Sequence, residues 1–280
     1  MQRLSLPEKK SIGARCNMGN LKEKKLFLLD MDGTIYLDNE LFDGTLDFLD
    51  YVKKIGGRYI FLTNNSSKGV EQYVEKLKGM GIAATEEDFL TSTDATILYL
   101  KEKNYKKIYV FGTGSFCRQL KDAGLSVTTK REEGIDCLCI SNDTELTFQK
   151  LEDACILLGQ GVDYVATNPD WVCPTSYGFV PDCGSFAEML WRATGRRPIF
   201  IGKPEPTMAE LAMKKTGFTK EETVLFGDRL YTDIACGVRA GISTVFVLSG
   251  EGTMADVEKS EVKPEMIYQN IRQIYEELIR

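Results

Sequence analysis

The sequence contains no histidine in its 280 residues. The commonest general base and the commonest transition-metal ligand of proteins are therefore both missing. Any catalysis by this chain must rely on carboxylates and lysine. Carboxylate oxygens select hard cations, so Mg²⁺ is the first candidate for a bound metal.

The sequence also lacks long apolar runs and cysteine pairs of the C-x-x-C type. No stretch approaches 18 consecutive apolar residues, and the first 24 residues are polar and basic without the apolar centre of a signal peptide. We therefore expect a soluble, cytoplasmic protein without a membrane partner. The 8 cysteines are scattered without a C-x-x-C pair, as reduced core thiols would be, and we assign them no chemistry.

A large excess of positive charge is absent as well. The chain has 35 Lys and Arg against 41 Asp and Glu, a net charge of −6. This balance gives no support to a nucleic-acid partner and favours chemistry on a small molecule. A chain of 280 residues is long for one domain, so we expect two.

Short β-rich runs alternate with amphipathic segments from residue 25 onward. Strands are expected at 25–30, 58–62, 199–201, 223–227 and 243–248, and helices at 44–55, 67–79, 206–216, 231–240 and from about 270. Such alternation predicts an α/β fold with a parallel sheet and right-handed crossovers.

The block 88–196 has an alternation of its own, with strands expected near 108–111, 137–140 and 164–167. It is too long and too regular for a loop. We therefore predict a second α/β domain, inserted into a core that consists of residues 23–87 and 197–280. Residues 1–22 are expected to be a disordered tail or an overlong start.

The segment Asp30-Met31-Asp32-Gly33-Thr34 follows the apolar run 26–29, which has the character of a buried parallel strand. Its two carboxylates are thus expected at the carboxyl end of a strand, where open α/β sheets bind ligands. One carboxylate can act as a covalent nucleophile toward phosphorus, and the other can donate and remove protons. The segment predicts phosphoryl transfer.

Three further segments at strand ends carry polar residues of a matching kind. Thr63-Asn64-Asn65-Ser66 offers a hydroxyl and backbone N–H groups suited to phosphate oxygens. Lys203 is held between a glycine and prolines, and Asp228 and Asp233 follow the expected strand 223–227. Taken alone, an Asn-rich turn with a helix cap explains the Thr63 segment about equally well, and a surface lysine explains Lys203 better. Asp233 alone fits an acid in the first turn of a helix, where it favours the helix dipole.

Together these motifs resemble the haloacid-dehalogenase-like hydrolase superfamily, and in particular its NagD and p-nitrophenylphosphatase branch of subfamily IIA. The matching strings begin at Asp30, Thr63, Ala166, Ile201 and Gly227, and the resemblance spans residues 25 to about 275. It implies a Rossmann-like parallel-sheet core and an inserted α/β cap domain of type IIA.

The resemblance implies a catalytic role for each matching position. Asp30 would be the nucleophile and Asp32 the general acid and base. Asp32, Thr63, Asn64 and Lys203 would contact the phosphoryl group that is transferred.

The resemblance also implies a Mg²⁺ site formed by Asp30, the backbone carbonyl of Asp32, and Asp228. Asp233 would lie behind this site and hydrogen-bond a water on the metal. Electrostatics independently favours a metal, because two unit charges about 4 Å apart repel by ~4 kcal/mol at an effective dielectric near 20. Clustered carboxylates could not otherwise accept a phosphate dianion.

These roles predict a Mg²⁺-dependent phosphomonoester hydrolase that forms an aspartyl-phosphate intermediate on a small phosphorylated metabolite. A phosphomutase or phosphotransferase of the same superfamily is the alternative among enzymes, and a non-catalytic protein that binds a phosphorylated ligand is the alternative outside them. Aryl phosphates, nucleoside monophosphates, sugar phosphates, phosphoglycolate and pyridoxal phosphate all stay open as substrates.

The inserted domain is expected to act as a lid that excludes water and contacts the leaving group. Asp143, Asn168 and Asp170 follow its expected strands and are candidates for substrate specificity, while turn and helix-cap roles explain them equally well. An exposed apolar face of this domain could support a homodimer, and the oligomeric state is left open.

Overall fold

The structure is a computed structural model that describes residues 21–175 and 178–280. Of the tail or overlong start expected over 1–22, residues 1–20 lie outside the described residues. Leu21, in contrast, is only 2% exposed and packs in a hydrophobic core, and the Lys24 ammonium donates to the carbonyl of Glu221 at 2.6 Å. The last residues of that expected tail therefore belong to the packed fold.

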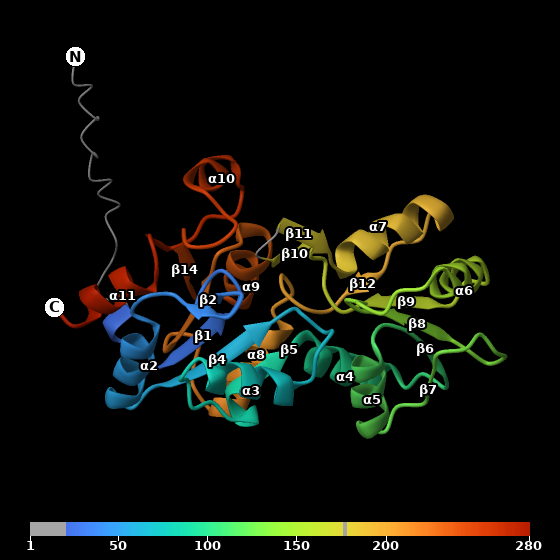
Figure 1. Cartoon of the computed structure of the whole chain (residues 1–280), viewed down its shortest axis with the longest axis horizontal. Coiled ribbons are helices and arrows are strands. Elements are labelled where there is room, and N and C mark those ends of the chain that lie inside the picture. The colour runs from blue at the N-terminus through green and yellow to red at the C-terminus, as the bar shows by residue number, and fades with distance from the viewer. Residues whose placement is uncertain (1–20, 176–177) are drawn as a thin grey trace, which may run out of the picture.

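Six parallel strands form the larger sheet, in the order β15-β14-β13-β1-β4-β5 (Figure 1). Their bounds are β1 (Leu26–Asp30), β4 (Arg58–Thr63), β5 (Phe89–Thr91), β13 (Thr223–Gly227), β14 (Ser243–Val247) and β15 (Met266–Tyr268). β1 lies between β13 and β4, and chain order reverses on its two sides. This position is the topological switch point at which open α/β sheets bind ligands.

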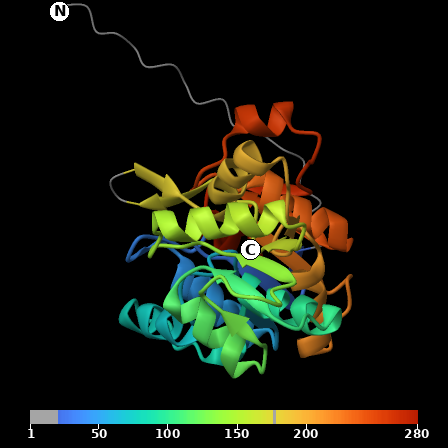
Figure 2. The same ribbon diagram turned by 90° about the vertical axis from the view of Figure 1, so that its right-hand side faces the viewer.

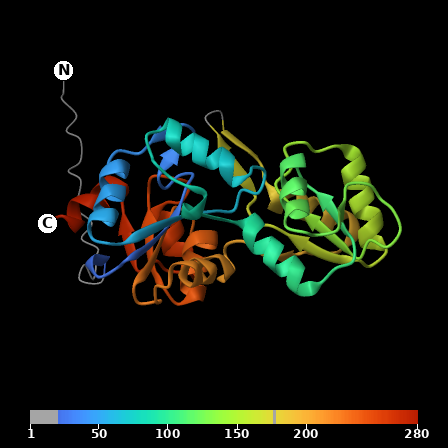
Figure 3. The ribbon, with the colours of Figure 1, turned by 90° about the horizontal axis from the view of Figure 1, so that it is seen from below.

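Both faces of this sheet are buried, which explains the continuous apolar run of β1. Phe27 and Leu29 face one hydrophobic cluster and Leu26 and Leu28 the other, as the alternation of a strand requires. Helices α2 (Thr45–Lys54), α3 (Val70–Gly79) and α11 (Ile271–Leu278) cover the first face, and α4 (Ser92–Lys103), α8 (Thr207–Thr216) and α9 (Ala235–Ala240) cover the second (Figure 3).

A second parallel sheet has the order β12-β9-β8-β6-β7 and lies at the other end of the molecule (Figures 1 and 2). Its strands are β6 (Ile108–Phe111), β7 (Val127–Thr128), β8 (Cys137–Ile140), β9 (Asp163–Ala166) and β12 (Ile199–Phe200). Helices α6 (Phe148–Gly159) and α7 (Cys183–Thr194) pack on one face, and α5 (Gly114–Asp122) packs on the other. We call this unit the cap. The α/β class, with a parallel-sheet core and a cap, is thus confirmed.

Two short strands lie near the predicted domain boundaries, and each pairs with the sheet of the other domain than its predicted range implies. Phe89–Thr91 lies in the predicted insert 88–196, yet it pairs with β4 of the larger sheet. Ile199–Phe200 lies in the predicted core segment 197–280, yet it pairs with β9 of the cap. Such short strands carry no periodic pattern that could identify their partner sheet, because pairing depends on tertiary contacts.

Smaller elements complete the fold. The described residues also form the antiparallel hairpins β2–β3 (Tyr36–Leu37, Glu40–Leu41) and β10–β11 (Val172–Thr175, Gly178–Pro181). The remaining helical elements are α10 (Met254–Lys259), the 3₁₀ helix Glu86–Asp88 and the π-helical turn Leu230–Ile234. The hairpin β10–β11 lies between the two units in Figures 1 and 3. No helix in the described ranges has the length and apolarity needed to cross a membrane.

Candidate active site

The carboxyl end of β1 places two aspartates in a tight turn. Asp30 is the last residue of the strand, and its Oδ2 accepts a hydrogen bond from Thr34 Oγ1 at 3.3 Å. The Asp32 Oδ2 accepts from the Tyr36 hydroxyl at 3.3 Å. Gly33 has φ of +91°, and a Cβ there would lie 2.5 Å from Asp228 Oδ2. The turn therefore needs a glycine for its backbone and for close approach.

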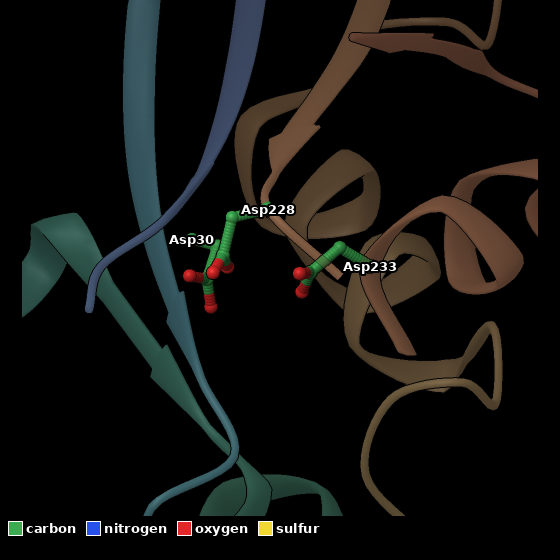
Figure 4. A group of neighbouring side chains, drawn as sticks. All are labelled: Asp30, Asp228 and Asp233. Carbon is green, nitrogen blue, oxygen red and sulfur yellow. The ribbon is translucent and has the colours of Figure 1, made fainter. Parts of the chain in front are cut away.

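Three carboxylates converge beside this turn (Figure 4). One oxygen from each of Asp30, Asp228 and Asp233 lies within 4.8 Å of the others. Asp228 follows β13 directly, and Asp233 comes from the π-helical turn behind it. Burial, together with repulsion from Asp30 and Asp233, raises the pKa of Asp228 well above its ordinary value. The cluster therefore concentrates negative charge that needs a cation.

Lys203 supplies one cation to this cluster. Its ammonium lies 2.5 Å from Asp30 Oδ1 and 2.6 Å from Asp233 Oδ1, and the residue is only 2% exposed. Burial alone lowers the pKa of a lysine, but the Asp233 and Asp30 carboxylates outweigh it and raise the pKa of Lys203 above its ordinary value. Lys203 is thus a permanently charged ammonium between two carboxylates.

The Asn64 side chain fixes the main chain of Lys203. Its Oδ1 accepts from the Lys203 N–H and its Nδ2 donates to the Lys203 carbonyl, each at 2.9 Å. Gly202 permits this contact, because a Cβ there would lie 2.6 Å from both Asn64 Oδ1 and the Thr167 carbonyl. The Asn64 amide therefore has a positioning role.

A small cavity of about 30 Å³ lies at the convergence point. The residues that line it come from both units: Asp30, Asp32, Thr63, Asn64, Asn65, Asp170, Val172, Cys173, Asp182, Lys203, Arg229, Thr232 and Asp233. Burial and the nearby Asp30 charge raise the pKa of Asp32, while the Lys76 ammonium opposes them. A raised pKa favours the protonated form of this carboxyl, the form that can give a proton to a departing oxygen.

Cap residues reach this cavity through the strand ends and the hairpin β10–β11. The Asn168 amide donates to Asp170 Oδ2 at 3.0 Å and to Asp182 Oδ1 at 3.2 Å, so it holds two carboxylates side by side. Burial and the Asp170 charge raise the pKa of Asp182 to about 7. Asp170 also lies 3.5 Å from the Arg229 guanidinium of the core. Asp170 thus faces the site, whereas Asn168 orients it.

Asp143 does not belong to this arrangement. Its carboxylate is fully buried against the Lys150 ammonium at 2.7 Å, and its Oδ1 accepts from the Glu145 N–H at 2.9 Å. These contacts lie within the cap, and Asp143 is absent from the residues that line the cavity. The structure therefore gives Asp143 the role of a turn residue, and the expectation of a specificity role for it is not supported by its position.

Sequence reasoning did not single out Arg229, Asp182 and Lys76. The Arg229 Nε lies 2.8 Å from Glu251 Oε2, and the backbone N–H of Arg229 donates to Asp233 Oδ2 at 3.1 Å. Its place next to Asp228 was the available signal. Asp182 is the N-cap of α7, where it accepts from the Cys183 N–H, and such a residue carries no signal of a site by itself. Lys76 lies on α3 with no motif around it, so only the tertiary structure reveals it.

Comparisons with known proteins show which family this chain resembles. Residues 27–126 match a family described as haloacid dehalogenase-like hydrolase, and residues 200–274 match one described as HAD-hydrolase-like. An acid sugar phosphatase of Staphylococcus aureus (strain MRSA252) is 35% identical over 259 residues, which cover 92% of this chain and 99% of that protein.

Two solved structures illustrate the likeness in three dimensions. The crystal structure of a 4-nitrophenylphosphatase from Thermotoga maritima has a TM-score of 0.85 and 39% identity, with 92% of this chain and 98% of that chain covered. A glycerol phosphate phosphatase from Mycobacterium tuberculosis, in complex with calcium, has a TM-score of 0.84 and 27% identity, with 91% and 76% covered.

Proposed function

The chain belongs to the haloacid dehalogenase-like hydrolases, in their NagD-like branch, and from this premise we propose a Mg²⁺-dependent phosphatase that acts through an aspartyl phosphate. The observation that carries this proposal is the convergence of the Asp30, Asp228 and Asp233 carboxylates, with the Lys203 ammonium between two of them, Asp30 and Asp233. Relatives that are named as phosphatases support the reaction class.

Asp30 is proposed as the nucleophile. The Lys203 ammonium contacts Asp30 Oδ1 and the Thr34 hydroxyl donates to Asp30 Oδ2, so the carboxylate is oriented at the strand end. One Asp30 oxygen would form a bond to phosphorus as the ester P–O bond breaks. Thr63 lines the cavity, and it and the backbone of Asn64 would contact the phosphoryl oxygens together with the Lys203 ammonium.

Asp32 is proposed as the general acid and base. In its protonated form, which the raised pKa favours, it would give its proton to the departing alcohol oxygen. It would then take a proton from the water that attacks phosphorus, as the bond between phosphorus and Asp30 breaks. Inorganic phosphate leaves, and both aspartates return to their starting states.

The residues present fit a divalent cation. Asp228 Oδ1 is buried and has no hydrogen-bond partner among the residues that the structure describes, so an acceptor is left over inside the cluster. Asp30, Asp228 and the carbonyl of Asp32 would hold Mg²⁺, whose charge would offset repulsion between the carboxylates and a phosphate dianion. Both Asp233 oxygens already have protein partners, Lys203 and the Arg229 N–H, which suits a place behind the metal.

A relative that is named as a sugar phosphatase and one that was solved with calcium support a small phosphorylated substrate and a divalent cation. A cytoplasmic location and a homodimer through the cap stay predictions.

The test measures phosphate release from 4-nitrophenyl phosphate and a panel of phosphorylated metabolites, with and without Mg²⁺. Wild type should turn over, and Asp30→Asn should lose at least about a thousandfold in kcat, because no nucleophile remains. Asp50→Asn, an exposed aspartate on α2, is the matched control and should keep its rate. Mass spectrometry of an Asp32→Asn variant should find a phosphoryl group on the peptide that contains Asp30. A wild type inert toward the whole panel would refute the proposal.

A further inference from the structure

A second, larger cavity of about 530 Å³ adjoins the catalytic one along helix α3. We call it the α3 cavity. The two cavities share Asp32, Asn65 and Cys173 among the residues that line them. The catalytic cavity, at about 30 Å³, has room for little more than the group that reacts. The rest of a substrate must therefore extend beyond it.

Asp32 fixes the direction in which a substrate would extend. On the proposed function, this residue protonates the oxygen of the leaving group, so that oxygen must lie within hydrogen-bond reach of the Asp32 carboxyl. Asp32 lies on the boundary between the two cavities. A leaving group attached to that oxygen would then enter the α3 cavity.

The α3 cavity is lined by hydrogen-bond donors and acceptors and by charges of both signs. Lys68 and Lys76 offer ammonium donors, and Asp32 and Asp38 offer carboxylate acceptors. Asn39, Asn65 and Gln72 contribute amides. A hydroxyl both donates and accepts a hydrogen bond, so a group rich in hydroxyls matches a lining of mixed donors and acceptors.

Flat aromatic leaving groups lack a stacking partner in this cavity. Tyr73 is the one aromatic residue among its lining residues, and it is only 3% exposed. The Tyr73 hydroxyl also donates to the Asn65 carbonyl at 3.2 Å, which holds the ring in the core. A nucleobase or an aryl group gains most of its binding energy from stacking on an exposed ring, which this wall does not provide.

Lys68 and Lys76 differ in how they are held. Lys76 Nζ lies 3.9 Å from Asp32 Oδ1 and 3.7 Å from the centre of the Tyr36 ring, so charge and a cation–π contact keep it beside the general acid. Lys68 is exposed and forms no ion pair with any residue of the described ranges. Lys68 is therefore the donor that is free to bind a ligand.

We propose that the α3 cavity is the leaving-group subsite of this enzyme and selects a hydroxylated leaving group, that of a sugar or polyol phosphate, with Lys68 and Gln72 as specificity residues. This inference rests on the proposed phosphatase function and goes beyond it, because it names the residues that would select the leaving group of the substrate.

The test compares kcat/KM for a hexose phosphate and for glycerol phosphate with kcat/KM for 4-nitrophenyl phosphate. In Lys68→Met and in Gln72→Leu, the ratio of the polyol ester to the aryl ester should fall about tenfold, the loss expected for one hydrogen bond from a well-placed donor. Lys78→Met is the matched control, since Lys78 is exposed on the same helix outside the cavity, and it should leave the ratio unchanged. Thermal melts check that each variant is folded.

The possible failures are distinguishable. A wild type that releases phosphate from none of these esters refutes the phosphatase proposal and the subsite with it. A wild type that hydrolyses them, with the same ratio in all three variants, refutes the subsite alone. A wild type that prefers an ester with an acidic leaving group, such as phosphoglycolate, also overturns the choice of a hydroxylated group.

Discussion

The Asn64 side chain holds both peptide groups of Lys203, although the two residues are 139 positions apart in the chain. One end of the amide accepts from the Lys203 N–H and the other donates to its carbonyl, each at 2.9 Å. Lys203 in turn bridges Asp30 and Asp233. The position of the catalytic ammonium thus depends on a side chain that follows a different strand, β4.

Loss of the Asn64 amide should displace Lys203. We expect Asn64→Leu to lower kcat by about 10- to 100-fold and to cost about 2 kcal/mol of stability, since two buried peptide groups lose partners. Asn64→Asp keeps the acceptor for the Lys203 N–H and should lose less of both. Steady-state kinetics and denaturant unfolding measure the two effects. Equal kcat in both variants and wild type would contradict the positioning role.

Removal of the metal should abolish turnover and lower stability. Chelation should stop phosphate release, and added Mg²⁺ should restore it, because the carboxylates repel a phosphate dianion without a cation. Mg²⁺ should also raise the melting temperature of wild type, since it binds the native state only. Asp228→Asn should lose that rise. Undiminished activity after exhaustive chelation, or an equal Mg²⁺ shift in Asp228→Asn, would contradict the site.

Asp182 should make stability fall as the pH rises. Its pKa is raised to about 7 in the folded protein, by burial and by Asp170, from an ordinary value of 3.8. Between these values the folded protein holds a proton that the unfolded chain has released, so the free energy of unfolding decreases with pH up to about 7 and then levels.

The Asp182→Asn variant tests this dependence. Asparagine mimics the protonated carboxyl. The melting temperature of the variant minus that of wild type should therefore increase steadily from pH 5 to about pH 7. Asp50→Asn, exposed on α2, should run parallel to wild type. Asp170→Asn removes the neighbouring charge and should weaken the dependence. Melting curves for Asp182→Asn that stay parallel to wild type across this range would show the assignment to be wrong.

The ion pair between Asp170 and Arg229 should help to hold the cap against the core. Arg229 is anchored to the core by Glu251 at 2.8 Å, and its guanidinium lies 3.5 Å from Asp170 of the cap. We expect Asp170→Asn to raise KM several-fold and to speed hydrogen exchange in the hairpin β10–β11, because one attraction between the units is lost. Unchanged exchange and unchanged KM would argue against this contact as a link.

The sequence predicted the strands of the larger sheet well where the chain is apolar on both faces. The run that forms β1 is one example, and the helices α2, α3, α8 and α11 lie within a few residues of their predicted ranges. It did not predict that Phe89–Thr91 pairs in the larger sheet and Ile199–Phe200 in the sheet of the cap. Strands of two or three residues have no sequence pattern that indicates which strand they pair with. The cap hairpin β10–β11 was also missed.

By itself, the sequence determined which chemistry its motifs can attempt: with no histidine, the segments at strand ends supply carboxylates and one lysine amine. Parallel strands of one sheet bring their carboxyl ends to one edge, so the convergence of Asp30 and Asp228 followed from local pattern. Lys203 instead follows β12, which pairs in the sheet of the cap, so its place beside them was decided by the tertiary structure. Only the tertiary structure decided what surrounds them. It turned Asn64 toward Lys203, buried Asp143 against Lys150, and set Lys76 beside Asp32. Such contacts depend on side-chain packing between distant segments, which no local pattern encodes.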